Sequence, residues 1–83
     1  MDWLPVTSSA FRSVRYDEQQ RHMDVLFHNG TITRYHRVPQ RVHTKLVGHP
    51  SPGFYLNTGV KPFFQSIDLP VTAESLSPLQ EEE

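Results

Sequence analysis

The 83-residue sequence contains no cysteine, so neither a disulfide framework nor a thiolate metal site can stabilise the fold. It has no apolar run near the roughly 20 residues that a membrane-spanning helix needs. Residues 1–5 lack the basic and apolar regions of a secretory signal. We therefore expect a cytoplasmic protein with no membrane partner, stabilised by burial of large side chains in one small domain.

Basic residues are missing from the end of the chain, and acidic residues are sparse before it. Residues 1–64 hold all eight Lys and Arg and four Asp and Glu, a balance of 8 − 4 = +4. Residues 65–83 hold five acidic residues and no basic one, a balance of −5. The sequence predicts a mildly basic domain over residues 6–64 and an acidic, disordered tail over residues 65–83. Such a domain would attract phosphate, and the tail could shield it.

Two segments before residue 29 alternate between apolar and polar residues, which is typical of β-strands. In residues 11–17, FRSVRYD, Val14 and Tyr16 share one face. In residues 22–28, HMDVLFH, the residues Met23, Val25 and Phe27 share another. The polar residues 18–21 between the two segments allow the chain to reverse.

Asn29-Gly30 is the strongest short hairpin signal in the sequence, because both residues tolerate the positive φ of a type I′ turn. A two-residue loop would pair Phe27 with Ile32 and Asp24 with Tyr35. This register predicts that Tyr35 and Arg37 lie on a solvent-exposed sheet face. Their neighbours Arg34 and His36 would then point to the polar end of the core side.

A short helix is predicted for residues 39–47, where Val42 and Leu46 form a narrow apolar stripe and Gly48 is placed to end the helix. Residues 54–57, FYLN, are predicted to be extended. The expected fold class is α+β. It comprises a three-stranded antiparallel meander, one short helix packed on one face and a short C-terminal extended segment.

Residues from Val6 to Lys61 resemble the KTSC domain, a small domain found at the C-terminus of some lysyl-tRNA synthetases and as a stand-alone bacterial or phage protein. The similarity is carried, in order, by Ser8-Ser9, Val14, Tyr16-Asp17, Val25, Phe27, Asn29-Gly30, Tyr35, Val38-Pro39, Val42, Leu46, Ser51, Gly53, Tyr55 and Asn57. Thr33 departs from the family pattern, which often has an aromatic residue there. The resemblance implies an RNA-binding accessory module.

Catalytic and metal chemistry find little support in the sequence. Ser8-Ser9, Ser13 and Ser51 lie in no nucleophile motif, so no catalytic residue is predicted. The register places His22 and His28 on one face and His36 on the other, so the histidines do not converge on a metal. We predict a non-enzyme without metal or cofactor.

Binding of RNA or tRNA is the most concrete function, because single-stranded RNA is often held where aromatic rings stack bases and basic residues contact phosphates. The predicted binding residues, on the exposed sheet face and a neighbouring basic strip, are Arg15, Arg34, Tyr35, Arg37, Arg41, Lys45, Tyr55, Asn57 and Lys61.

The alternative function is a protein–protein interaction module with no nucleic-acid role. Residues 11–17 would accept a strand from a partner if they form a sheet edge. Trp3, Phe54, Phe63 and Phe64 could form an aromatic contact patch, although a chain this small needs most of its aromatic residues in the core. The oligomeric state is left open by the sequence.

Overall fold

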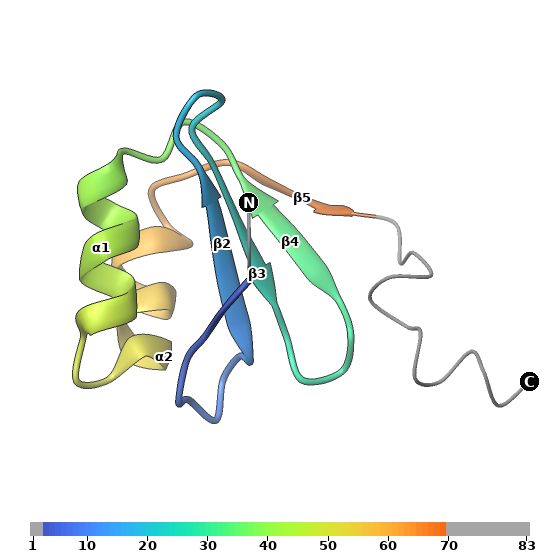
Figure 1. Cartoon of the computed structure of the whole chain (residues 1–83), viewed down its shortest axis with the longest axis vertical. Coiled ribbons are helices and arrows are strands. Elements are labelled where there is room, and N and C mark those ends of the chain that lie inside the picture. Colours follow the sequence, from blue (N-terminus) through green and yellow to red (C-terminus); the bar gives the residue numbers. More distant parts are fainter. Residues whose placement is uncertain (1–2, 70–83) are drawn as a thin grey trace, which may run out of the picture.

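A five-stranded antiparallel sheet covered on one face by helices makes up the computed structural model, which describes residues 3–69 (Figure 1). The strands lie in sequence order and are β1 (Leu4–Pro5), β2 (Ser13–Asp17), β3 (His22–Leu26), β4 (Ile32–Tyr35) and β5 (Ser66–Leu69). The helical layer consists of α1 (Gln40–Gly48), α2 (Pro52–Tyr55) and the π-helix η1 (Leu56–Val60). The α+β class is confirmed, and β1 and β5 extend the predicted three-stranded meander to five strands.

The turn between β3 and β4 differs from the predicted type I′ turn by one residue. Phe27 N donates to Thr31 O at 2.9 Å, and Gly30 N donates to Phe27 O at 3.0 Å. Gly30 has a φ of 92°, whereas Asn29 is not among the residues with positive φ. These features describe a three-residue loop, a type I turn followed by a glycine bulge.

This extra loop residue reverses the predicted faces of β4. Leu26 pairs with Ile32, and Met23 pairs with Tyr35. Because side chains alternate along a strand, a slip of one residue moves every side chain of β4 to the opposite face. The prediction that Tyr35 lies on the exposed face and Arg34 on the core side is therefore wrong: Tyr35 is buried, and Arg34 pairs with Asp24 on the face away from the helices.

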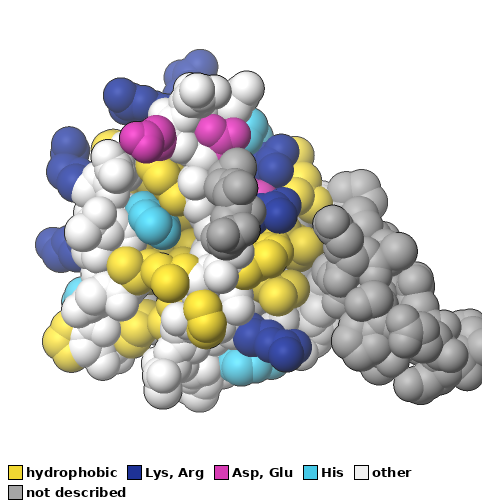
Figure 2. Space-filling model, in the orientation of Figure 1, with side chains coloured by type: hydrophobic (Ala, Val, Ile, Leu, Met, Phe, Trp, Pro, Cys, Tyr) yellow, Lys and Arg dark blue, Asp and Glu magenta, His cyan; other side chains and the backbone are white. Residues whose placement is uncertain are grey.

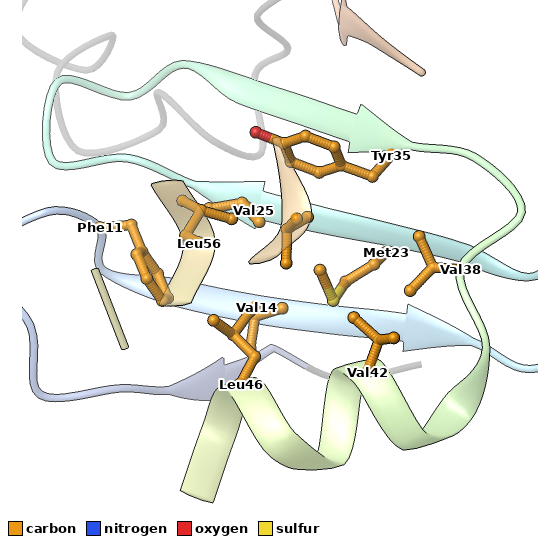
Figure 3. Packing of buried hydrophobic residues seen from close by; sticks show 10 residues of the cluster. Phe11, Val14, Met23, Val25, Tyr35, Val38, Val42, Leu46 and Leu56 are labelled. Carbon is orange, nitrogen blue, oxygen red and sulfur yellow. The ribbon is translucent and has the colours of Figure 1, made fainter. Parts of the chain in front are cut away.

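The hydrophobic core lies between the sheet and the helical layer. Figure 3 shows Val14, Met23, Val25 and Tyr35 from the strands meeting side chains of the helices. The helical layer contributes Val42, Leu46, Leu56 and Val60, all of them buried. Burying one aliphatic side chain of this size is worth about 1.5–3 kcal/mol. The predicted apolar stripe of the first helix is thus confirmed.

The chain after α1 is helical where the sequence predicted an extended segment. Pro52 begins α2 in the first helical position, where its missing N–H costs nothing. In η1, Lys61 N donates to Leu56 O at 2.9 Å, the wide spacing of a π-helix. A Cβ on Gly59 would lie 2.5 Å from Cε1 of Tyr55, so this glycine gives the tyrosine ring room instead of breaking the helix.

Strand β5 pairs with β4 along its whole length, within the segment predicted to be a disordered tail. The remainder of that predicted tail, residues 70–83, lies outside the described residues. At the opposite edge, β1 pairs with Val14 and Ser13, so β2 is not the sheet edge that the sequence suggested. In the described part of the chain, no helix has the length and apolar character needed to cross a membrane.

Replacing Gly30 by Ala should lower the free energy of unfolding by about 1–2 kcal/mol, because alanine resists a left-handed backbone. Asn29→Ala should cost about 0.5 kcal/mol, since it removes one exposed hydrogen bond from Thr31 N. Urea denaturation of both variants measures the difference. Equal losses would instead indicate a type I′ turn, which needs positive φ at both positions.

Candidate nucleic-acid interface

The sheet face away from the helices carries a cluster of three charged residues centred on Asp24. Arg15 Nε donates to Oδ2 of Asp24 at 2.9 Å. Arg34 donates twice, from Nε to Oδ1 at 2.8 Å and from Nη2 to Oδ2 at 3.0 Å. Asp24 itself is 2% exposed. Both predicted binding arginines of the sheet thus share one buried carboxylate, which offsets half of their charge.

The charge state of this cluster follows from the balance of burial and ion pairing. Burial raises the pKa of Asp24, but the hydrogen bonds from Arg34 and Arg15 and their positive charges outweigh burial, so the net pKa is lowered from 3.8. The guanidinium of Arg15 also lies 4.4 Å from the centre of the Trp3 ring, a cation–π contact. The cluster is therefore ionised at neutral pH, and its arginines are held by the protein itself.

Tyr35 does not belong to any binding surface. Its exposed fraction is 2%, and it packs in the core with Met23 and Val25. Burial, together with the negative charge of Asp68, raises its pKa above the ordinary value of 10.0. The predicted stacking role of Tyr35 is wrong, because the three-residue turn directs its ring into the core.

The helical layer carries positive charge without any acidic residue. Residues 40–61 contain Arg41, Lys45 and Lys61 and no Asp or Glu. Arg41 and Lys45 are exposed and one turn apart on α1, and Figure 2 shows basic side chains along this side of the molecule. Like charges at this spacing destabilise a helix by about 0.2–0.5 kcal/mol. Arg41 is also near the helix N-terminus, where the helix dipole disfavours a cation.

Tyr55, the last residue of α2, lies beside this positive charge and contacts side chains at the C-terminal end of α1. The Lys45 ammonium lies 5.4 Å from the centre of the Tyr55 ring, and the His49 ring stacks on Tyr55 with centroids 5.3 Å apart. The ring also packs closely against Gly59. Tyr55 therefore positions Lys45 and His49, while its faces are largely occupied by the protein.

Phe54 is one of the four aromatic residues that the sequence offered for a contact patch, and the structure exposes it. It belongs to α2 and is 62% exposed. It is not among the predicted RNA-binding residues, because an extended segment at residues 54–57 gives no reason to place its ring beside Lys45. We call Arg41, Lys45, His49, Phe54 and Tyr55 the α1–α2 strip.

The other predicted binding residues lie outside this strip. Asn57 is exposed on η1. The Lys61 ammonium lies 5.9 Å from the centre of the Phe27 ring, next to the β3–β4 turn. Arg37 follows β4 in a left-handed conformation with φ of 58°. The nine predicted residues are thus divided between the core, both layers and the connection after β4.

The histidines are distributed differently from the prediction. His22 and His36 lie on one side of the sheet, with ring centroids 5.1 Å apart in an edge contact, where opposite faces were expected. His43 stacks on Tyr16 with centroids 5.1 Å apart, and burial lowers its pKa from 6.5. Among residues 3–69, no three His, Cys, Asp or Glu side chains gather as a metal site would require.

Comparison with known proteins identifies the family. The model of the KTSC domain matches residues 7–64. An uncharacterized protein of Stutzerimonas stutzeri (strain A1501) is 36% identical over 62 residues, which cover 75% of this chain and 87% of that protein. The crystal structure of a KTSC domain protein from Yersinia pestis is 26% identical with a TM-score of 0.79, and the match covers 83% of this chain and 97% of that one.

The lowered pKa of Asp24 predicts an acid-sensitive fold. The pKa of Asp24 is lower in the folded protein than in the unfolded chain. Its ionised form therefore stabilises the fold at any pH above the pKa of the unfolded chain, and this stabilisation is lost as the pH falls through the pKa of the folded protein. Urea denaturation between about pH 7 and pH 2 should show this loss. Asp24→Asn should lower stability by about 1–3 kcal/mol at pH 7 and flatten the acid dependence. Identical acid dependences for the two proteins would contradict the assignment.

Tyr35→Ala should lower the stability of the fold. Removing a buried aromatic ring costs about 3–5 kcal/mol, so the variant should be unfolded or strongly destabilised in thermal denaturation. Tyr35→Phe keeps the ring and serves as the control, with near-normal stability. A stable, folded Tyr35→Ala variant would contradict the burial of this residue.

Proposed function

The chain belongs to the KTSC domain family, and we propose that it is a small non-catalytic binding module that holds single-stranded RNA on the α1–α2 strip. The observation that carries the proposal is that the described acidic residues are confined to the sheet layer, whereas the helical layer has basic residues alone. All three charged residues from Gln40 to Lys61 are basic. The described acidic residues, Asp17, Glu18, Asp24 and Asp68, lie in the sheet layer or its β2–β3 turn.

The strip combines the two kinds of group that single-stranded nucleic acid requires. Arg41 and Lys45 supply positive charge for phosphates, and neither forms an ion pair within residues 3–69. Phe54 supplies an exposed ring on which a base can stack. The like charges of Arg41 and Lys45 reduce the stability of α1, and Arg41 lies where the helix dipole disfavours a cation, so Arg41 is better explained by binding than by folding.

The sheet face is a weaker candidate for RNA than the sequence suggested. Its aromatic residue Tyr35 is in the core, and its arginines are held by Asp24. We therefore assign the RNA contacts to the helical layer, with Asn57 and Lys61 at its margin. The proposal includes a cytoplasmic location in a bacterium or phage. The bacterial origin of both relatives supports the bacterial option.

A protein-interaction module is the second candidate, because β5 forms an edge of the sheet. Ser66, Ile67 and Asp68 are exposed, and Ile67 presents an apolar side chain there. An exposed edge strand offers free backbone groups to a strand of a partner. This function would use β5 instead of the predicted edge at β2.

Two charge-matched double variants test the RNA proposal. Arg41→Gln/Lys45→Gln removes the strip's cations, and Arg12→Gln/Arg21→Gln removes two exposed arginines elsewhere, so both proteins have the same net charge. Fluorescence anisotropy with a mixed-sequence single-stranded RNA measures affinity at several salt concentrations. The strip variant should reduce the log–log salt slope by about 1.4, or 0.7 per lost phosphate contact. The control should change little.

Phe54→Ala adds a test of base stacking at constant charge. The variant should weaken RNA binding by about 1–3 kcal/mol without lowering the unfolding temperature, because the side chain is largely exposed. Absence of binding by the unmodified protein at about 50 mM salt, where phosphate contacts are strong, would refute the RNA proposal. Equal losses in the two double variants would refute the location of the site.

A further inference from the structure

A pocket opens where the end of β4 meets the segment that leads into β5. Its volume is about 280 Å³, and its lining residues are His36, Arg37, Phe63, Phe64 and Gln65. None of these residues belongs to the α1–α2 strip. Small-molecule sites commonly have volumes of about 300–1,000 Å³, so this pocket is close to the lower limit of that range and suits a ligand no larger than a single nucleotide.

The backbone holds Arg37 at the pocket in an unusual conformation. Its φ is 58°, a left-handed value that residues with a Cβ rarely adopt. His36 N donates to Gln65 O at 2.9 Å, and Val38 N donates to Arg21 O at 2.9 Å, so hydrogen bonds fix the chain on both sides. Val38 is also fully buried. Strain of this kind persists only where the surroundings impose it, and it often marks a ligand site.

The lining side chains offer two distinct chemistries at one place. The Phe63 ring is 71% exposed, while its backbone N–H is anchored to Val60 O at 3.0 Å. The Arg37 side chain is exposed and forms no ion pair with any residue from 3 to 69. An accessible aromatic face stacks on a planar heterocycle, and a guanidinium binds phosphate with two parallel hydrogen bonds.

Polar groups complete the lining. The His36 ring is held by its edge contact with His22, and the Gln65 side chain is a donor and an acceptor. Such groups can read the edge of a heterocyclic base. A purely anionic ligand would leave Phe63 unused, and a purely apolar one would leave Arg37 unused.

We propose that this pocket binds a single phosphorylated nucleotide, with the base stacked on Phe63 and the phosphate held by Arg37. The ligand is either a free mononucleotide or the phosphorylated end of an RNA chain, which present the same base and phosphate. The site is separate from the α1–α2 strip, so it can exist whether or not the strip binds RNA.

A titration followed by ¹H–¹⁵N NMR tests the site with three probes: adenosine 5′-monophosphate, adenosine and inorganic phosphate. The monophosphate should shift the amide signals of His36, Arg37 and Gln65 with saturation, and should bind at least tenfold more tightly than either fragment. No saturable shift at millimolar monophosphate, or equal binding of monophosphate and inorganic phosphate, would overturn the proposal. A preference for a 5′-phosphorylated tetranucleotide over its 5′-hydroxyl form and over the monophosphate would identify an RNA end as the ligand.

Arg37→Gly and Arg21→Gly form a matched pair for this site. Both arginines are exposed and left-handed, with φ of 58° and 62°, so glycine suits both backbones and neither variant should lose thermal stability. Arg37→Gly should weaken monophosphate binding at least tenfold, whereas Arg21→Gly should change it less than threefold.

Phe63→Ala should weaken binding of the monophosphate while leaving that of inorganic phosphate unchanged, because it removes the stacking surface alone. Its exposed side chain makes unfolding of the variant unexpected, and the unfolding temperature checks this. Equal effects of the two glycine variants, or full binding by Phe63→Ala, would overturn the assignment.

Discussion

The hydrogen bonds that close the β3–β4 turn determine which side chains of β4 lie in the core and which lie on the opposite face of the sheet. Phe27 and Thr31 pair across a loop of three residues, and Gly30 supplies the left-handed conformation that the loop needs. Because strand side chains alternate, the length of this loop sets the orientation of every residue in β4. Tyr35 consequently enters the core, and Arg34 joins Arg15 around Asp24 on the other face.

The same register explains how charge is distributed over the molecule. Asp24 is nearly fully buried and pairs with two arginines, so the cluster of Arg15, Asp24 and Arg34 on the open face of the sheet retains a net charge of only +1. The helices, in contrast, have no acidic residue to offset Arg41 and Lys45. Among residues 3–69, these two cations have no acidic partner, and they lie in the same layer as the exposed side chain of Phe54. The sheet face is better suited to maintaining the fold.

Two connections at one end of the sheet, the β2–β3 turn and the segment after β4, each contain an arginine with a strained backbone. Arg21 and Arg37 have left-handed backbones, and the hydrogen bond from Val38 N to Arg21 O joins the two connections directly. The buried side chain of Val38 holds this junction against the core. The energy that keeps Arg37 at its pocket thus comes from packing elsewhere, as is usual for strained residues at ligand sites.

The alternating strands, the apolar stripe of α1, the family and the basic character of the domain were predictable from the sequence, because each depends on local spacing, residue order or composition. The sequence could not determine the length of the β3–β4 loop, since Asn29-Gly30 suits two turn types that differ by one residue. The sequence also could not show that Phe54 and Tyr55 lie in a helix, because proline and glycine, here Pro52 and Gly59, usually interrupt regular structure. In the folded protein, Gly59 packs against the Tyr55 ring, a contact that the sequence does not reveal. Strand β5 forms where the sequence has no strong period, because β4 offers it an edge. The candidate binding surfaces therefore depend on tertiary structure: the length of the β3–β4 loop places Tyr35 in the core, and the packing of the helical layer leaves Phe54 and Phe63 exposed.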